Sequence, residues 1–313
     1  MIYHTIIAVA LALILDWIIG DPRNYPHPVK LIGWLARRLE KIFYPMQGGG
    51  FVTVMIIYAV SFVLPFILLK ILAPWPTIQF LLEVIIIYTS LSLKDLLIHS
   101  RRVRTALKSG DIVRSRRAVS MMVGRDTEEL DETAVCQATF ESVAENFSDG
   151  VVAPLFFALI GGAPLAMLYK SINTCDSLFG YRNERYYKFG FWAAKIDDVA
   201  NFIPARLAAV GVLIATPFMG LSGKNCFAVI CRDAKKHLSP NSGYPESAFA
   251  GTCGVKIGGT HHYGKKTVIK PHIGNKLHYL TPAIVEQAET ICIVTTVILF
   301  PIIAAGVVIA KQL

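Results

Sequence analysis

Acidic side chains between residues 125 and 149 recur at helical spacing. Asp131, Glu141 and Glu145 share one face of an expected helix, and Asp149 follows one turn later. Like carboxylates three or four residues apart repel one another unless a cation lies among them. A solvated acidic face is the simplest interpretation of such a run. The polar residues among these acids, and the apolar stretch that follows at once, favour a functional site instead.

Two further clusters of oxygen-bearing side chains follow along the chain. Such oxygens suit Mg²⁺, which usually takes one or two carboxylates and leaves its other positions to water and phosphate. Arginines beside the clusters are suitable clamps for phosphate oxygens. The same acids and arginines are also compatible with internal ion pairs next to a membrane segment. The residues concerned are Asn173, Asp176, Glu184 and Arg185, then Asp197, Asp198, Asn201 and Arg206, with Arg125 beside the first cluster.

Proline-restricted backbone brings a further acid and a histidine together near the N-terminus. Asp21 lies in a Gly-Asp-Pro turn, and His27 lies between two prolines. A helix stop followed by a kink explains these residues equally well.

Several common motifs are missing from the sequence. There is no G-x-S-x-G, no H-E-x-x-H and no G-x-G-x-x-G. The stretch 259–265 has the outline of a phosphate-binding loop, but Lys266 occupies the position where Ser or Thr would hold Mg²⁺. The six cysteines form no C-x-x-C pair, so we expect them to be reduced. A transferase or ligase that depends on Mg²⁺ and phosphate is the reaction class that remains.

Membrane helices are expected to hold these residues in place. The chain has 313 residues, of which 54% are hydrophobic and 17% charged, and its mean hydropathy is +0.50. The net charge of +9 fits basic loops on the inner side of a membrane better than a nucleic-acid-binding face, so no nucleic-acid partner is expected. These values indicate a multi-pass protein of the cell membrane.

Four segments are apolar enough to cross a bilayer, which takes about 20 helical residues. They are residues 2–19, which we expect to be a retained anchor, 51–73, 78–93 and 291–310. Two more runs, 151–169 and 207–221, are interrupted by glycine or proline and are expected to be re-entrant or spanning helices.

The expected fold is therefore all-α: a polytopic integral membrane protein in which residues 1–313 form a single membrane-embedded domain. Polar loops 94–150 and 170–290 are predicted to carry the active site on the cytoplasmic side. All the basic segments share that side only if neither interrupted run fully crosses, and six full crossings remain the alternative. Asp126 and Glu129 predict a capping box at a helix start, and residues 224–279 predict an irregular loop.

Several stretches resemble one family, the adenosylcobinamide-phosphate synthases of cobalamin biosynthesis, of the CbiB/CobD type. The matching stretches are Gly20-Asp21-Pro22, His27-Pro28-Val29, Gly124-Arg125-Asp126-Thr127, Glu141 to Asn146 with Asp149-Gly150, Asn173 to Ser177, Gly180-Tyr181, Glu184-Arg185-Tyr186, Asp197-Asp198 to Arg206, and Ser239-Pro240-Asn241 to Gly254. The likeness spans residues 16–264.

This resemblance implies an amide ligase that joins a carboxylate of adenosylcobyric acid to (R)-1-aminopropan-2-ol or its O-phosphate, with ATP and Mg²⁺. Expected partners are the corrinoid, the amine, membrane lipid and other membrane enzymes of nucleotide-loop assembly. Catalytic roles are assigned to His27, Glu141, Glu145 and Asp198. Metal-binding roles are assigned to Glu141, Glu145, Asp149, Asp197 and Asp198. Substrate or phosphate contacts are assigned to Asp21, Arg125, Asp126, Asn146, Asn173, Asp176, Glu184, Arg185, Asn201, Arg206, Ser239, Asn241 and Glu246.

Two other functions stay open on the residues alone. A membrane prenyl- or phospho-transferase would use the Asp197-Asp198 pair to hold a Mg²⁺-diphosphate. A membrane sensor or transporter would line a path through the bilayer with charges, although here most charges fall in the loops.

Overall fold

The computed structural model describes residues 2–21, 27–181, 183–264 and 266–312. The chain forms two compact units. The first contains Met1–Ser92, Ala153–Phe202 and Ile302–Leu313, and the second contains Leu93–Val152 and Ile203–Pro301. Most of the chain is helical, which confirms the prediction of a largely all-α polytopic protein.

The first unit is a bundle of helices. Helix α3 packs against α8, α1 against α4, and α10 against α8. Its core includes Val54, Ile57 and Phe179, all of which are buried. The helices are α1 (Ile2–Ile19), α2 (Pro28–Phe43), α3 (Gly49–Ile71), α4 (Pro76–Tyr88), α8 (Ala153–Phe179), α9 (Tyr186–Phe189) and α10 (Phe191–Ala200).

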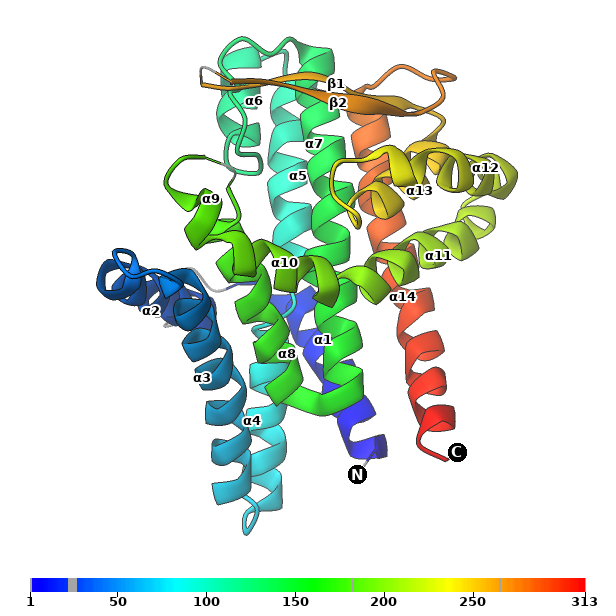
Figure 1. The fold of residues 1–313 in the computed structure, drawn as a ribbon. Coiled ribbons are helices and arrows are strands. Elements are labelled where there is room, and N and C mark those ends of the chain that lie inside the picture. The colour runs from blue at the N-terminus through cyan, green and yellow to red at the C-terminus, as the bar shows by residue number, and fades with distance from the viewer. Residues whose placement is uncertain (1, 22–26, 182, 265, 313) are drawn as a thin grey trace. The chain divides into compact units, whose positions relative to one another are not determined.

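Helices α3 and α4 form a tight hairpin, which Figure 1 shows as two antiparallel helices. Pro76 lies in the first turn of α4, where its missing N–H leaves no helical bond unmade. Helix α4 ends at Tyr88 and has only 13 residues. The helix observed in the predicted span 78–93 is therefore shorter than a membrane-crossing helix must be.

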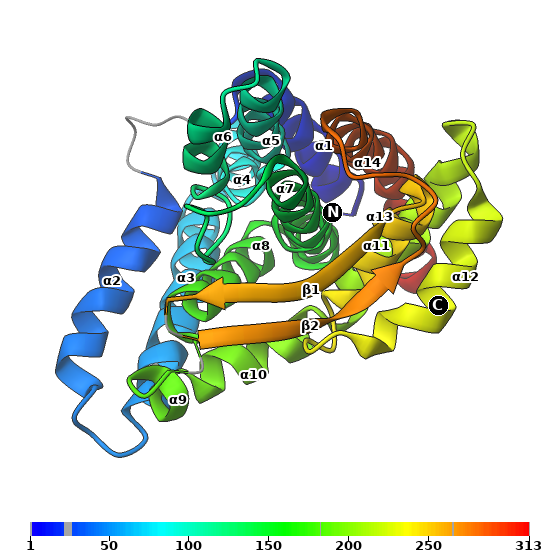
Figure 2. The same ribbon diagram turned by 90° about the horizontal axis from the view of Figure 1, so that it is seen from above.

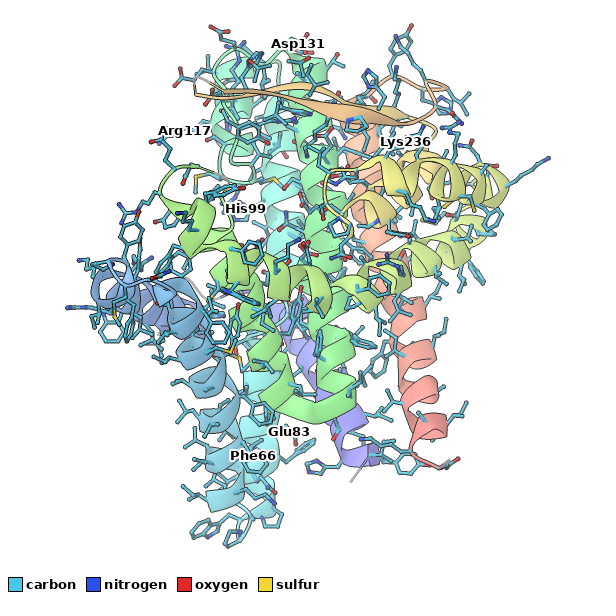
Figure 3. The ribbon with its side chains drawn as sticks, viewed as in Figure 1. Phe66, Glu83, His99, Arg117, Asp131 and Lys236 are labelled. Carbon is cyan, nitrogen blue, oxygen red and sulfur yellow. The ribbon has the colours of Figure 1, made fainter. Side chains whose placement is uncertain are left out.

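Helix α8 reverses direction within its length (Figure 1). The break lies at Gly161 and Gly162, whose backbones are not helical, and Gly162 has a φ of 66°. Glu83 of α4 accepts a hydrogen bond from the Ala163 N–H just after the break, and Figure 3 shows Glu83 close to this turn. Residues 151–169 were expected to be either re-entrant or spanning, and the reversal corresponds to the re-entrant alternative.

The second unit consists of helices and a two-stranded antiparallel sheet. Helix α7 packs against α5, α6 and α13, and α12 packs against α13. The elements are α5 (Leu93–Lys108), α6 (Ile112–Val119), α7 (Glu132–Phe147), the π-helical turn η1 (Ser148–Val152), α11 (Phe202–Phe218), α12 (Gly223–Asp233), the 3₁₀ turn η2 (Ala234–Lys236), α13 (Gly243–Cys253), β1 (Lys256–Tyr263), β2 (Lys266–Gly274) and α14 (Pro282–Ala310). Helix α11 begins, and helix α14 ends, in the first unit.

Two local predictions for this unit are wrong. Helix α7 begins at Glu132, and its N-cap is Asp131, whose carboxylate accepts the Ala134 N–H. Figure 3 shows Asp131 at this end of α7. The Asp126 carboxylate accepts a hydrogen bond from Gly264 instead. Residues 224–279 are not irregular, because they form α12, α13 and the β1–β2 hairpin, whose strands lie side by side in Figure 2.

Four helical segments of the described chain are long and apolar enough to cross a membrane. Their number agrees with the sequence prediction, but one member differs. The run Glu132–Phe179, which includes the reversal at Gly161 and Gly162, qualifies by length and composition, whereas α4 does not. The others are Ile2–Ile19, Gly49–Ile71 and Pro282–Ala310, and α10 with α11 forms a further apolar pair bent by 45°.

Candidate functional site

A small polar pocket lies in the second unit and has a volume of about 130 Å³. Helix α7 contributes two carboxylates to it, the loop before α7 contributes an arginine, and strand β2 contributes a lysine. Helical spacing of four residues places Glu141 and Glu145 on one face of α7. The residues that line the pocket are Met122, Val123, Gly124, Arg125, Ala138, Glu141, Ser142, Glu145, Asn146, Tyr263 and Lys270.

Arg125 and Glu141 form a buried ion pair in this pocket. The Arg125 Nη1 atom lies 3.2 Å from Glu141 Oε2, and the two side chains are only 8% and 7% exposed. Glu141 Oε1 accepts two more hydrogen bonds, from Gln137 Nε2 and from the Gly258 N–H. Both oxygens of Glu141 are thus engaged, so its geometry suits an anchor for Arg125 better than a base or a metal ligand.

Glu145 is the more available of the two carboxylates. Its Oε1 atom accepts a hydrogen bond of 3.0 Å from the Ser242 hydroxyl. The residue is half-buried, and its charge acts on the neighbouring Lys270, Glu246 and His237. One hydroxyl donor leaves a carboxylate with further acceptor capacity, so Glu145 is the acid best placed to receive a proton or a cation.

Behind these residues lies a buried acid–histidine pair. His237 Nε2 lies 3.6 Å from Glu246 Oε1, and the side chains are 6% and 3% exposed. Neither of these two atoms has a hydrogen-bond partner among the described residues. Burial raises the pKa of Glu246 well above its usual value, and Glu145 and Glu141 add to this effect. Burial, together with Lys270, lowers the pKa of His237, so both groups favour their neutral forms.

Lys270 stays charged in this environment. Burial by itself would lower its pKa, but the nearby α7 carboxylates Glu145 and Glu141 oppose that effect, and the pKa is raised. The pocket therefore combines two cations, Arg125 and Lys270, with the carboxylates of α7. Groups of both signs in one concave site are suited to bind a ligand that carries both charges.

Long-range contacts fix the hairpin that carries Lys270. The Asp126 N–H donates to the His262 carbonyl, and the Gly264 N–H donates to the Asp126 carboxylate. At the other end of β2, Asp233 accepts the Gly274 N–H. Burial opposes the ionisation of Asp233, but its hydrogen bonds from Arg232 and Lys236 prevail and hold its pKa well below the usual range. The loop before α7 and helix α12 thus position β2.

The other predicted site residues of this unit lie outside the pocket lining. Arg206 lies over the Tyr244 ring at 4.2 Å from its centroid and donates to Asn241 Oδ1 at 3.4 Å. Ser239 accepts the backbone N–H groups of Asn241 and Ser242 with its hydroxyl, which shapes the turn before α13. Asp149 lies in the η1 turn and is half-buried.

The first unit has a larger pocket of about 570 Å³. Four aromatic side chains, two lysines and one carboxylate contribute to it. Among the predicted residues only Asp198 lines it, and Lys195 Nζ lies 3.6 Å from the Asp198 carboxylate. The lining residues are Gly180, Tyr181, Tyr186, Tyr187, Lys188, Gly190, Phe191, Ala194, Lys195 and Asp198.

Asp197 belongs to a different environment from Asp198. Its Oδ2 atom accepts a hydrogen bond from Asn201 Nδ2, and Asn201 Oδ1 accepts one from the Tyr169 hydroxyl. Asn201 and Tyr169 are buried. Asn173 and Asp176 follow Tyr169 on α8 and are half-buried. Asp197 and Asp198 therefore do not form a paired carboxylate site.

The remaining predicted residues of the first unit lie around α2. His27 Nδ1 accepts the Val29 N–H as the N-cap of α2, and His27 Nε2 lies 3.6 Å from Asp21. Arg185 forms an ion pair of 2.8 Å with Glu40, and Glu40 raises the Arg185 pKa. Glu184 is exposed. The predicted residues thus fall in two units, and their union in one joint site stays a prediction.

Sequence reasoning missed three members of the site in the second unit: Lys270, Tyr263 and His237. Lys270 and Tyr263 lie in strands more than 100 residues away from α7, and no local pattern connects them with it. The phosphate-loop outline at 259–265 was the only signal near them. Among the described residues, no group of three or more His, Cys, Asp or Glu side chains is arranged to hold a metal ion.

The sequence matches the family model described as CobD/Cbib protein over residues 9–292. A relative from Clostridium perfringens, named cobalamin biosynthesis protein CobD, is 46% identical over 275 residues, which is 86% of this chain and 87% of the relative. A protein of the same name from Leptospira interrogans is 39% identical over 306 residues, with 93% and 94% coverage. One from Geobacter metallireducens is 43% identical over 283 residues, 86% of each chain. No solved structure matches this chain.

Proposed function

Because this chain belongs to the CobD/CbiB family of cobalamin biosynthesis proteins, we propose that it is the amide ligase of that pathway. The proposed reaction joins a carboxylate of adenosylcobyric acid to (R)-1-aminopropan-2-ol or its O-phosphate and consumes ATP. The observation that carries this proposal is the pocket of the second unit, where Arg125, Lys270 and Glu145 meet. An amide ligase needs a cationic hold on phosphate and a base for the attacking amine.

The roles of the two α7 carboxylates differ in this proposal. After ATP has phosphorylated the carboxylate, the amine nitrogen attacks the carboxyl carbon, the C–O bond to the phosphate breaks and phosphate leaves. Glu145 accepts the proton that the nitrogen loses, because Glu145 keeps acceptor capacity. Glu141 is a positioning residue that orients Arg125. His237 and Glu246 form a neighbouring buried pair whose neutral forms are favoured, and the charge of Glu145 acts on both. His27, assigned a catalytic role from the sequence, caps α2, and its catalytic role stays a prediction.

We assign ATP to the larger pocket of the first unit. Its volume of about 570 Å³ falls within the usual range for small-molecule sites. Tyr181, Tyr187 and Phe191 offer ring faces for a purine, and Lys188 and Lys195 offer positive charge for phosphates.

Mg²⁺ enters this proposal as the companion of ATP, where it would neutralise phosphate charge. Mg²⁺ typically takes only one or two protein carboxylates and fills its sphere with water and phosphate oxygens. Asp198, a half-buried residue in the lining of the larger pocket, fits that donor set. Glu141 does not fit it, because both of its oxygens are already engaged.

The test is a reconstituted reaction. The purified protein in detergent receives adenosylcobyric acid, ATP, Mg²⁺ and either amine, and mass spectrometry follows the amide product. We expect product only when all components are present, and none from the Glu145→Gln variant. Absence of product, together with absence of corrinoid binding, would exclude the proposed function. Protection by a lipid diphosphate instead would support the prenyl- or phospho-transferase alternative.

A further inference from the structure

Helix α2 of the first unit carries apolar and basic surface that its packing within the chain does not use. Its inner face packs against α3 and α8 and includes Ile32 and Ala36, which are buried. We propose that the outer surface of α2 lies in the headgroup region of the bilayer and binds anionic phospholipids. This contact is independent of the amide-ligase reaction, because α2 contributes no residue to the lining of either pocket.

The outer surface of α2 has two stripes of different character. Three hydrophobic side chains at i, i+4 and i+11 form an apolar stripe, and three cations at i, i+7 and i+11 form a basic stripe. Trp34 lies between the stripes, and the Arg38 guanidinium is 5.5 Å from the centre of its ring. This pattern is typical of helices that lie in the plane of a membrane interface. The apolar stripe consists of Leu31, Leu35 and Ile42, and the basic stripe consists of Lys30, Arg37 and Lys41.

The charges of α2 favour an external anion. The single acid of the helix, Glu40, is buried and forms an ion pair of 2.8 Å with Arg185. Among the described residues, Arg37, Arg38 and Lys41 have no carboxylate within ion-pair distance. Exposed cations beside an exposed apolar stripe complement lipid phosphates above acyl chains. Each basic residue near an anionic membrane surface contributes about fivefold in affinity.

The position of α2 agrees with a membrane interface. Helix α3 has 23 residues, and at about 1.5 Å per residue it is long enough to cross a hydrocarbon core of about 30 Å. Exposed aromatic rings lie at both of its ends, as is usual at membrane interfaces. Phe51 packs against Trp192 at 5.2 Å near the N-terminal end, and Trp75 is exposed beyond the C-terminal end. Helix α2 adjoins the N-terminal end and runs across the direction of α3 (Figure 1 and Figure 2).

The fluorescence of Trp34 tests the proposal in the full-length protein. A variant that keeps Trp34 as its only tryptophan is titrated in detergent with acyl-brominated phosphatidylglycerol or phosphatidylcholine, because bromine quenches tryptophan on contact. We expect half-maximal quenching at a phosphatidylglycerol concentration at least tenfold below that of phosphatidylcholine. The control keeps only Trp75, which is 55% exposed against 54% for Trp34, and should respond alike to both lipids. A phosphatidylglycerol preference as large at Trp75 as at Trp34 overturns the inference.

Removal of cations tests the basis of the preference. In the protein that keeps Trp34, three substitutions in α2 should bring the two lipids within twofold of each other and leave the response to phosphatidylcholine unchanged. A matched control removes three exposed arginines from α5 and α6 and should keep the preference. The α2 substitutions are Arg37→Gln, Arg38→Gln and Lys41→Gln, and the control substitutions are Arg102→Gln, Arg114→Gln and Arg117→Gln.

The remaining outcomes also decide the question. Equal quenching by both lipids before substitution, or an equal loss of preference in the control, overturns the inference. Trp34 that neither lipid quenches is covered by a second copy of the chain or by another protein, which also overturns it. If the α2 substitutions alter the response to phosphatidylcholine, a salt titration of the unsubstituted protein replaces them. The preference should then fall as salt screens the cations, and a preference that salt does not change overturns the inference.

Discussion

Glu141 and Glu145 are one helical turn apart, yet their surroundings give them different tasks. Glu141 is bound by Arg125 and two N–H donors, whereas Glu145 is bound by one hydroxyl. The contrast arises because Arg125, Gln137 and the hairpin residue Gly258 all contact the first of them. A carboxylate whose oxygens all accept hydrogen bonds or ion pairs stabilises the protein. One that keeps hydrogen-bond acceptor capacity can take part in a reaction.

Substitution at Glu145 should therefore affect activity, and substitution at Glu141 should affect stability. Glu145→Gln is expected to abolish amide formation and to leave thermal stability nearly unchanged. Glu141→Gln is expected to destabilise the protein by roughly 3 kcal/mol, because it leaves the buried Arg125 charge unpaired. Thermal unfolding in detergent and product formation measure the two effects. Equal loss of stability in both variants would contradict this division of roles.

Glu246 should make stability depend on pH. Its pKa is raised in the folded state by burial, so the folded protein binds a proton that the unfolded chain releases. Stability is therefore full below the unfolded pKa of about 4.3 and falls as pH rises toward the raised folded pKa. Each unit of elevation corresponds to about 1.4 kcal/mol.

Glu246→Gln keeps a neutral side chain of the same shape and removes this titration. We expect the wild-type unfolding temperature to fall more than that of the variant between pH 5 and pH 8. Parallel curves for the two proteins would show that Glu246 is ionised in the folded state.

At the scale of elements, the reversal of α8 depends on a glycine that no other residue can replace without strain. Gly162 has a φ of 66°, and a Cβ atom there would lie 2.7 Å from Glu83 Oε1. Proline and glycine in one apolar run suggested an interruption, but the sequence did not specify a change in direction. That change depends on Glu83 of another helix accepting the Ala163 N–H.

Gly162→Ala is expected to lower the stability of the folded protein by at least about 1 kcal/mol, from the positive φ and the close approach to Glu83. Gly306→Ala in α14 is the matched control, because no heavy atom lies within 4 Å of its added Cβ. Denaturation of the two variants in the same detergent compares them. A loss at Gly306 as large as that at Gly162 would contradict the role of the reversal.

For the whole molecule, the basic segments favour one cytoplasmic side for all the long polar loops. Cysteines provide a direct test, because Cys231 is exposed whereas Cys136, Cys175, Cys226 and Cys253 are buried. Cys231 lies in α12, within the polar segment 170–290 that we predict to be cytoplasmic.

A membrane-impermeant maleimide should label Cys231 in inverted vesicles but not in intact spheroplasts. Cys231→Ala removes the signal and serves as the blank. In that background, Ala73→Cys in the α3–α4 turn should be labelled in spheroplasts. Labelling of Cys231 from outside would reverse the predicted orientation.

Local sequence patterns were sufficient to predict the membrane class, most helices and part of the candidate site. Apolar runs and helical periodicity act over neighbouring residues, so Arg125, Glu141, Glu145 and Asn146 were recognisable from α7 and the loop before it. Lys270 joins them only through contacts made in the folded chain. The tertiary structure also separates Asp197 from Asp198. These outcomes depend on contacts between segments far apart in sequence, where hydrogen bonds to backbone groups and burial fix the positions of side chains, and no local pattern encodes them.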